Sequence, residues 1–334
     1  MKLKKVLVIR FSAYGDILMC LPALASLRRI CPDTEIHFLA VTKYTDVLAD
    51  LRGRLFDRLI AYKRTSGPTG IAEALSLGAR LRGERYDAIF DWQANPRSRI
   101  LSALIGARKR FSFNRRMRLH QLDKCYLTVR ELGVSPPKQP QPLKFARAEE
   151  DAWAQALLSK LPEDAVPITL GIGGLWATKL WAVERFNRLM EHILREVQAR
   201  FFLVGDERDR ERAARLASDF PDRVTNLTGS TTILQAAALV SRSALTVSND
   251  TSTMHLAWVQ GVPTIGIFGA TDPLRTGPMG LGSHIFSGLH LPCHPCFEGR
   301  CIFGEPRCLE KTEPMEVASK ALEILHANKL EGRD

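Results

Sequence analysis

Short apolar runs alternate with longer amphipathic stretches along most of the chain. Residues 6–9 form the first apolar run, and residues 17–30 then carry leucines at a spacing of three, at Leu18, Leu21, Leu24 and Leu27. The same rhythm predicts further strands over 35–40, 55–60, 86–90 and 109–113, and helices over 44–51, 71–81 and 97–105. Strands that alternate with helices predict a parallel, doubly wound α/β sheet.

A proline-rich stretch interrupts this rhythm. Residues 134–143, VSPPKQPQPL, contain four prolines and predict a linker. Beyond it the alternation restarts, with strands predicted over 168–171, 201–204, 244–247 and 262–268, and helices over 183–196, 209–218, 231–240, 254–260 and 316–327. The chain therefore predicts two α/β domains, 1–145 and 146–334, each long enough to enclose a core of its own.

Residues 248–273, SNDTSTMHLAWVQGVPTIGIFGATDP, read as strand, polar turn, short helix and strand. Asp250, Thr251 and Ser252 supply side-chain oxygens where the helix begins. Unpaired backbone N–H groups and the positive end of the helix dipole favour a phosphate at such a place. An ordinary helix cap in an α/β protein would use the same residue types, so both interpretations stand on this pattern alone.

Two further polar turns follow predicted strands. Ser12-Ala13-Tyr14-Gly15-Asp16 follows the first strand, and its Asp16 is either a base facing a ligand or a first-turn acid favoured by the helix dipole. Gly173 and Gly174 follow the first strand of the second half, with Lys179 shortly after. A flexible ammonium suits a pyrophosphate, although most lysines are simply solvated. Since no G-x-G-x-x-G follows the first strand, a nicotinamide enzyme is disfavoured.

Charge is distributed unevenly over the 334 residues. Residues 1–145 hold 27 Lys and Arg against 12 Asp and Glu, a charge of +15. The remainder carries −4, and the two parts sum to the net charge of +11. No acidic residue interrupts the basic stretch 97–118. An anionic partner such as nucleic acid, anionic lipid or a phosphorylated sugar fits this half. Nucleic acid is the weaker candidate, because no recognised nucleic-acid module is present.

Composition sets the remaining limits. No apolar run approaches the ~20 residues that a membrane span needs, and the charged start with its short apolar run predicts a first strand rather than a secretion signal. A cytoplasmic protein is therefore expected. Cys293, Cys296, Cys301 and Cys308 form a compact cluster that predicts either a structural zinc site or free thiols in an irregular loop. Three other cysteines, Cys20, Cys31 and Cys125, are predicted to pack in the core.

Together these motifs resemble glycosyltransferase family 9, the lipopolysaccharide heptosyltransferases. The donor-site pattern of that family matches at Asp250, Thr251, His255, Gly261-Val262-Pro263 and Thr271-Asp272-Pro273. Ser252 and Ala270 depart from it, since the family usually has Gly and Pro there. The turn at 12–16 resembles the family's Ser-x-x-Gly-Asp signature, Lys179 with Trp181 its Lys-x-Trp-Pro motif, and residues 91–95 its Asp-x-Gln-Gly-Asn segment. The resemblance spans both halves of the chain.

The resemblance implies a GT-B-like fold, with two Rossmann-like domains facing a central cleft. It implies an inverting, metal-independent transfer of heptose from ADP-L-glycero-D-manno-heptose to Kdo–lipid A or its heptosylated form, at the cytoplasmic face of the inner membrane and without a catalytic cofactor. Asp16 would be the catalytic base. Donor contacts would come from Gly173, Gly174, Lys179, Glu207 (or Asp206), Asp250, Thr251, Ser252 and His255. Acceptor contacts would come from Ser12, Tyr14, Gly15, Gln93, Asn95, Arg97, Arg115 and Arg116.

Two alternatives remain. A relative of the same family could use another nucleotide sugar, and a non-catalytic protein could bind sugar nucleotides or an anionic surface. Gly15 with Asp16 separates these classes, because a binding protein has no need of a base at the end of its first strand.

Overall fold

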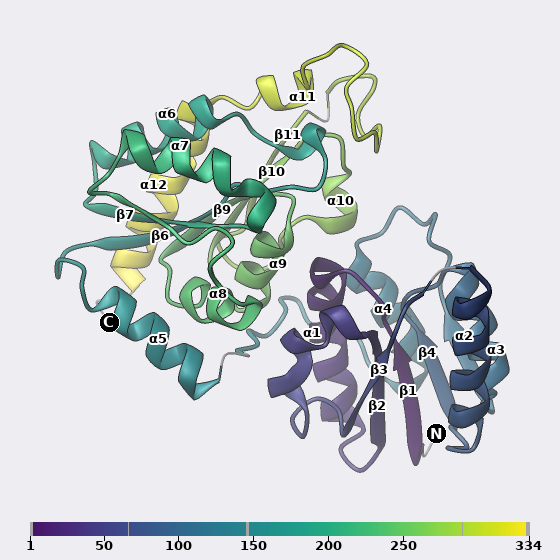
Figure 1. Cartoon of the computed structure of the whole chain (residues 1–334). Helices are drawn as coiled ribbons and strands as arrows, with labels where there is room; N and C mark the ends of the chain where they lie inside the picture. Colours follow the sequence, from purple (N-terminus) through teal and green to yellow (C-terminus); the bar gives the residue numbers. More distant parts are fainter. Residues whose placement is uncertain (1–2, 66, 145–146, 289, 332–334) are drawn as a thin grey trace. The chain divides into compact units, whose positions relative to one another are not determined.

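The chain folds into two compact units, each built on one parallel sheet (Figure 1). The computed structural model describes residues 3–65, 67–144, 147–288 and 290–331. Unit 1 is Met1–Pro140 and unit 2 is Gln141–Asp334, so the division falls inside the proline-rich stretch. The predicted doubly wound α/β class is confirmed for both units.

Unit 1 has a five-stranded sheet of order β3-β2-β1-β4-β5. Its strands are β1 (Lys5–Ile9), β2 (Glu35–Val41), β3 (Arg58–Tyr62), β4 (Ala88–Asp91) and β5 (Lys109–Ser112). Its helices are α1 (Tyr14–Ile30), α2 (Gly67–Arg82), α3 (Pro96–Ile105) and α4 (Gln121–Val129). Helix α1 packs with α4 and α2 packs with α3, on the two faces of the sheet (Figure 1).

The leucine stripe of α1 explains why this helix docks on the sheet. Leu18, Leu21, Leu24 and Leu27 are all fully buried, and full burial of such a side chain contributes about 1.5–3 kcal/mol. Strand β1 is buried on both faces from Val6 to Ile9, as expected of the central strand of a parallel sheet. Asp16, in the first turn of α1, therefore lies at the junction between a buried strand and a firmly packed helix.

Unit 2 has a six-stranded sheet of order β11-β10-β9-β6-β7-β8. Its strands are β6 (Val166–Gly171), β7 (Ala199–Val204), β8 (Val224–Asn226), β9 (Leu245–Asn249), β10 (Thr264–Phe268) and β11 (His284–Ser287). Its helices are α5 (Ala148–Leu158), α6 (Val183–Leu194), α7 (Arg210–Asp219), α8 (Ile233–Val240), α9 (Ser252–Val259), α10 (Pro273–Thr276), α11 (Arg307–Glu310) and α12 (Pro314–Glu331).

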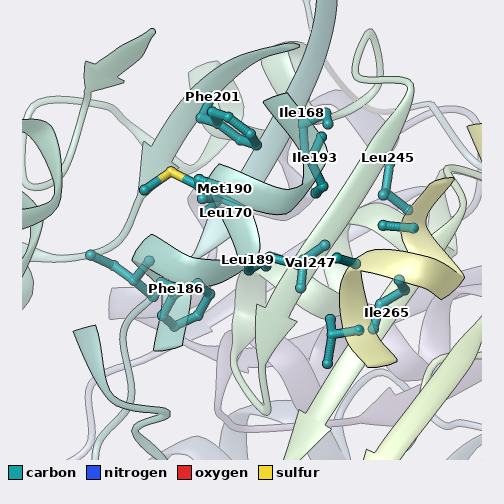
Figure 2. Close-up of a cluster of buried hydrophobic side chains, with 14 of the residues drawn as sticks. Ile168, Leu170, Phe186, Leu189, Met190, Ile193, Phe201, Leu245, Val247 and Ile265 are labelled. Atoms are coloured by element: carbon teal, nitrogen blue, oxygen red, sulfur yellow. The ribbon is translucent and has the colours of Figure 1, made fainter. Parts of the chain in front are cut away.

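The core of unit 2 lies between this sheet and helices α6 and α12 (Figure 2). Helix α6 buries Val183, Phe186, Leu189 and Ile193, a helical spacing that forms one apolar face. These side chains pack on strand residues such as Leu170, Leu203 and Val247, which are fully buried. The packed sheet holds the strand ends, where the candidate site lies, in fixed register.

Several short elements differ from their prediction. Residues 44–51, expected as a helix, form two 3₁₀ turns, η1 (Thr42–Tyr44) and η2 (Asp46–Leu51). Helices α4 and α5 were not predicted. Among the eleven residues of α5 whose burial is described, Ala154 alone is fully buried, so this helix has no apolar stripe to detect. Strands β8 and β11 are only three and four residues long, too short for a period to show.

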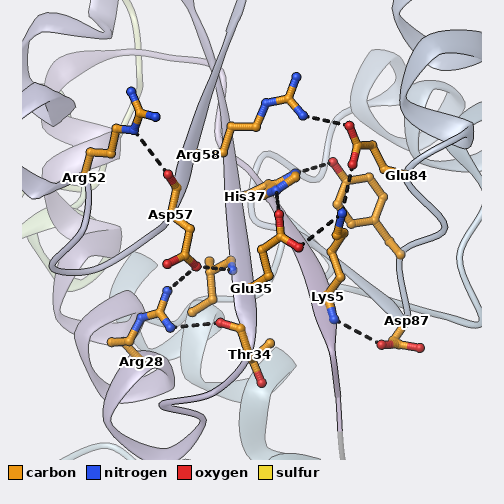
Figure 3. Close-up of polar contacts among 12 residues, drawn as sticks. Lys5, Arg28, Thr34, Glu35, His37, Arg52, Asp57, Arg58, Glu84 and Asp87 are labelled. Atoms are coloured by element: carbon orange, nitrogen blue, oxygen red, sulfur yellow. Dashed lines mark hydrogen bonds and ion pairs between the residues drawn. The ribbon is translucent and has the colours of Figure 1, made fainter.

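An ion-pair network closes the amino ends of the unit 1 strands, opposite the end that carries Asp16 (Figure 3). The Lys5 ammonium lies 2.9 Å from Glu84 and 3.1 Å from Glu35. The buried ring of His37 lies 2.7 Å from the Glu35 carboxylate. Arg28 contacts Asp57 at 2.5 Å in the same region. This cluster is structural and provides matched controls for charges at the other end of the sheet.

Within the described residues, no helix is both long and apolar enough to cross a membrane.

Candidate functional site

Two predicted ligand segments of unit 2 converge where its strand order reverses. Strands β6 and β9 pair in parallel, with Gly171 opposite Ser248. Strands β7 and β8 lie beyond β6, whereas β10 and β11 lie beyond β9. Open α/β sheets bind ligands at the carboxyl ends of strands at such a switch point. The loop after β6 leads to Lys179 and the loop after β9 leads to α9, so both segments lie at the carboxyl ends of these two strands.

Lys179 and Asp250 form a close, mostly buried ion pair. The Lys179 Nζ lies 2.7 Å from Asp250 Oδ2, and the two side chains are 18% and 6% exposed. The Thr271 hydroxyl, from the turn after β10, donates to the same oxygen at 2.8 Å. The ring centre of Trp176 lies 5.3 Å from the ammonium. The ammonium is thus held in place while part of it still faces solvent.

The first turn of α9 adds backbone donors beside this pair. Thr251 is the N-cap, in an extended conformation, and its side chain makes no capping hydrogen bond. Its hydroxyl lies instead 3.2 Å from the Ser248 hydroxyl. The first-turn N–H groups, beginning with Ser252, are therefore not capped by this side chain. A helix N-terminus next to a lysine attracts an anion. We call Lys179, Asp250, Thr251, Ser252 and Thr271 the α9 site.

His255 lies under the α9 site. Its ring is buried, with Nε2 4.0 Å from Asp250 Oδ1. The Trp258 indole donates to Nδ1 at 3.0 Å, which requires that this nitrogen carry no proton. The geometry gives His255 a supporting place behind Asp250, and its predicted donor contact stays a prediction.

A buried carboxylate that was not predicted from the sequence, Asp209, explains the glycine-rich turn after β6. Asp209 is 6% exposed, and a Cβ on Gly173 would lie 2.0 Å from its Oδ2. The N–H groups of Asp206 and Gly174 donate to Asp209, whereas burial raises its pKa. Gly173 is thus glycine because this carboxylate ties the ends of β6 and β7 together. In the sequence, Asp209 stands at the start of the predicted helix 209–218, where an acidic residue is common, so nothing there distinguished it from an ordinary helix-start acid.

The two acids proposed for the ribose differ in their surroundings. Asp206 accepts from Arg208 N at 2.9 Å and so caps the turn η5 (Glu207–Asp209). The Glu207 side chain is 69% exposed and lies 2.7 Å from Arg210. No hydrogen bond or ion pair of the described residues joins Glu207 to the α9 site. A ribose contact by Glu207 therefore stays a prediction.

In unit 1 the Asp16 turn, residues 10–16, holds its carboxylate by both oxygens. Arg10 Nη2 lies 2.6 Å from Asp16 Oδ1, and Ala13 N donates to Oδ2 at 3.2 Å. The Asp16 side chain remains 40% exposed. An ionised carboxylate has about four lone-pair directions, so both oxygens can still accept from a ligand. Arg10 was not among the site residues predicted from the sequence, although a charged residue directly after a buried strand could have pointed to it.

The predicted acceptor contacts in the same turn have other partners in this structure. The Tyr14 hydroxyl lies 2.9 Å from Asp46 and 3.0 Å from the Lys43 carbonyl, and burial with Asp46 raises its pKa. Ser12 N donates to Gln93 at 3.4 Å. Gly15 lies within the first turn of α1. The turn is therefore ordered, and its contacts with an acceptor stay predictions.

Gln93 and Asn95 lie in the turn after β4, and Gln93 connects that turn to residues 11 and 12. The Gln93 Oε1 accepts from Phe11 N at 2.9 Å, and Asn95 caps α3 by accepting from Ser98 N at 2.8 Å. Buried Asp91 accepts from Ala94 N at 2.9 Å, and burial raises its pKa. In the structure Gln93 joins the segment after β1 to the end of β4, at the switch point of unit 1, whereas Asn95 and Asp91 order the turn between β4 and α3. Acceptor binding by Gln93 and Asn95 stays a prediction.

The basic stretch is ordered and largely exposed. It begins with α3, where Arg97 is half-buried, continues into the edge strand β5, and ends in an exposed turn. Arg115 and Arg116 lie in this turn, which Asn114 stabilises by accepting from Arg116 N at 2.9 Å. A folded, cationic surface results, as expected for an anionic partner.

The four-cysteine cluster is not gathered into a metal site. Cys293 and Cys296 are exposed, whereas Cys301 and Cys308 are half-buried. Over the described part of the chain, no three His, Cys, Asp or Glu side chains are arranged to hold a metal ion. As placed, the cysteines do not fit the tetrahedral zinc that their spacing suggested. Burial raises the pKa of Cys308 to about 11.

The loop that carries these cysteines packs instead on the α9 site. Phe297 N donates to the Ala270 carbonyl at 2.9 Å, next to Thr271. The Thr178 hydroxyl, next to Lys179, donates to the Glu298 carbonyl at 2.5 Å. Of the other cysteines, Cys20 and Cys125 are buried as predicted, and Cys31 is half-buried at the end of α1.

Sequence comparison identifies relatives of this chain. The family model described as glycosyltransferase family 9 (heptosyltransferase) matches residues 123–306. The chain is 26% identical over 297 residues to the lipopolysaccharide core heptosyltransferase OpsX of Haemophilus influenzae, covering 82% of each protein.

Solved structures share the fold over nearly the full length. A glycosyltransferase family 9 protein from Veillonella parvula superposes with a TM-score of 0.83 at 20% identity, covering 97% of this chain and 98% of that one. The Escherichia coli heptosyltransferase WaaC, solved with ADP, has a TM-score of 0.71 at 22% identity, covering 96% and 99%. The predicted GT-B-like architecture is confirmed.

Proposed function

Because this chain belongs to glycosyltransferase family 9, the heptosyltransferases, we propose that it transfers heptose from ADP-L-glycero-D-manno-heptose to the lipopolysaccharide inner core. The observation that carries this proposal is the α9 site. Lys179, the first turn of α9 and Asp250 meet at the strand-order switch point of a nucleotide-binding type of sheet.

The α9 site suits the pyrophosphate of the donor. The Lys179 ammonium and the first-turn N–H groups of α9 are positive and fixed before the ligand arrives. As the sugar leaves, negative charge grows on the departing diphosphate, and fixed donors of this kind stabilise it. We propose that they take the place of a divalent ion, so that transfer is metal-independent. WaaC was solved with ADP, which supports an adenine nucleotide for this chain as well.

Asp16 is proposed as the general base. An acceptor hydroxyl loses its proton to this carboxylate as it attacks the anomeric carbon, and the nucleotide diphosphate leaves from the opposite face. A single displacement of this kind inverts the configuration. The half-exposed carboxylate is held by Arg10 and Ala13, so its position is defined before the acceptor binds. Positioning can supply much of the rate for such a base.

Arg115 and Arg116 are proposed to bind the anionic groups of Kdo–lipid A or its heptosylated form. Both lie in the exposed turn of the basic stretch. An acceptor of this class is a membrane lipid, so we propose that the protein works at the cytoplasmic face of the inner membrane as a peripheral enzyme. Anionic lipid headgroups favour such a basic surface by about 1 kcal/mol per cationic side chain.

Another nucleotide sugar is the second candidate for the donor. Calorimetric titration with ADP-heptose, ADP-glucose and UDP-glucose tests this choice, because the α9 site binds the diphosphate and the remaining contacts must distinguish base and sugar. We expect ADP-heptose to bind most tightly. Tighter binding of a UDP-sugar would replace the donor and leave the transferase class intact.

A further inference from the structure

Arg10 is a buried cation directly after the central strand of unit 1. It is 5% exposed and follows Ile9, the last residue of β1. Its two terminal nitrogens have different partners. Nη1 donates to the Trp92 carbonyl at 2.5 Å, and Nη2 lies 2.6 Å from Asp16 Oδ1. Because the guanidinium is planar, these two contacts fix its plane relative to β4 and α1.

The surroundings of Arg10 leave Asp16 as its counter-charge. Two buried thiols, Cys20 and Cys125, lie 3.3 Å from one another. Burial disfavours the charged form of Arg10, but the carboxylate of Asp16 offsets it, and the pKa of the guanidinium is raised. Arg10 Nε is buried and has no hydrogen-bond partner among the described residues. The guanidinium is therefore positioned by two contacts, one of which is the proposed base.

Asp16 in turn depends on Arg10 for its orientation. Without the guanidinium, the one remaining protein donor to the carboxylate among the described residues is Ala13 N, at 3.2 Å. A side chain that is 40% exposed can then rotate away from its present position. A base must lie within hydrogen-bond reach of the proton it takes, and a misplacement of about 1 Å can lower a rate by about 10²-fold.

We propose that Arg10 is a positioning residue for transfer: it holds Asp16 through Nη2 and is itself anchored to the Trp92 carbonyl. This inference rests on the proposed role of Asp16 as the base. Arg10 is buried behind the carboxylate and acts through it. Its loss should therefore affect turnover far more than donor binding, which belongs to unit 2.

Three variants test this role. Arg10→Met removes the charge and both hydrogen bonds at similar length. Arg10→Lys keeps the charge but has a single nitrogen, which cannot hold Asp16 and Trp92 with the same planar geometry. Arg28→Met is the matched control, because Arg28 also pairs with one aspartate, Asp57, at 2.5 Å, but at the other end of the sheet. We would measure kcat, acceptor KM, ADP affinity by calorimetry and thermal unfolding for each variant.

We expect Arg10→Met to lower kcat by about 10²-fold with ADP affinity unchanged. Arg10→Lys should recover part of that loss, and Arg28→Met should keep kcat near the wild-type value. Wild-type kcat in a folded Arg10→Met protein would overturn the proposal, as would equal losses in Arg10→Met and Arg28→Met. If the Met variant does not fold, the Lys variant decides: reduced kcat at normal ADP affinity supports the role, and wild-type kcat overturns it.

Asp16→Asn, measured in parallel, distinguishes a failure of the positioning role of Arg10 from a failure of Asp16 as the base. An inactive Asp16→Asn protein beside a fully active Arg10→Met protein would overturn the positioning role alone. An Asp16→Asn protein with normal turnover would overturn the proposed base itself.

Discussion

Lys179 provides the most quantitative test of the α9 site. The Lys179→Met substitution removes the ammonium that lies 2.7 Å from Asp250 and keeps the length of the side chain. Two effects follow. The diphosphate loses a cationic donor, and the Oδ2 atom of buried Asp250 loses its ion pair and keeps the hydrogen bond from the Thr271 hydroxyl, at 2.8 Å.

The magnitudes of the two effects differ. A charge-assisted hydrogen bond contributes about 1.5–3 kcal/mol, which corresponds to a loss in ADP affinity of about 10- to 150-fold. Breaking a buried ion pair costs about 3–5 kcal/mol of stability. The Lys179 and Asp250 side chains are 18% and 6% exposed, so this pair is nearly buried and its loss should cost close to that amount. The variant should therefore unfold at a lower temperature as well as bind ADP more weakly.

Calorimetric titration with ADP, well below the unfolding temperature, measures the first effect alone. Asp250→Ala should also weaken ADP binding, by a smaller factor, because the carboxylate orients the ammonium. Since the two side chains touch, the double variant should show a coupling energy of about 0.5–3 kcal/mol. Lys320→Met is the matched control, because Lys320 pairs with Glu323 on α12. If Lys179→Met and Asp250→Ala both bind ADP with wild-type affinity, the α9 site is not the diphosphate site.

Three further results are expected. Asp16→Asn should lower kcat by about 10²–10⁴-fold at unchanged ADP affinity, and it should unfold at a lower temperature because Arg10 loses its counter-charge; normal turnover would remove Asp16 as the base. Reversal of Arg115 and Arg116 to Glu should raise acceptor KM and leave ADP binding alone, with exposed Arg52 and Arg54 reversed as the control; equal KM in both pairs would make the basic turn a solvated face. At pH 8, an alkylating reagent should modify exposed Cys293 and Cys296 quickly and Cys308 slowly, because a pKa of about 11 keeps the Cys308 thiol protonated. If all four cysteines resist alkylation until a chelator is added, the zinc interpretation would be restored.

Sequence periodicity predicted most of the fold because the long elements have clear patterns. The stripe of α1 and the apolar runs of β1, β6 and β9 each point to one burial arrangement. Elements without a stripe, such as α5, depend on contacts made far along the chain, and local pattern does not report those.

The candidate site divides in the same way. Lys179, Asp250 and Asp16 follow strand ends, which is a local property, so their places could be predicted. The partners that position them come from distant segments. Thr271 reaches Asp250 across 21 residues, and Gln93 reaches Phe11 across 82. Spacing alone also could not show that Gln93 supports the backbone after β1, because this role depends on which strands become neighbours. The capping of α3 by Asn95 is local, within three residues.

Product analysis tests the central claim most directly. The purified protein is incubated with ADP-L-glycero-D-manno-heptose and either Kdo–lipid A or its heptosylated form, and the lipid is examined by mass spectrometry. The proposal predicts that one acceptor gains a single heptosyl residue with release of ADP, with EDTA present or absent, and that Asp16→Asn protein forms this product far more slowly. Wild-type protein that binds ADP-heptose but transfers no heptose to either lipid would contradict it.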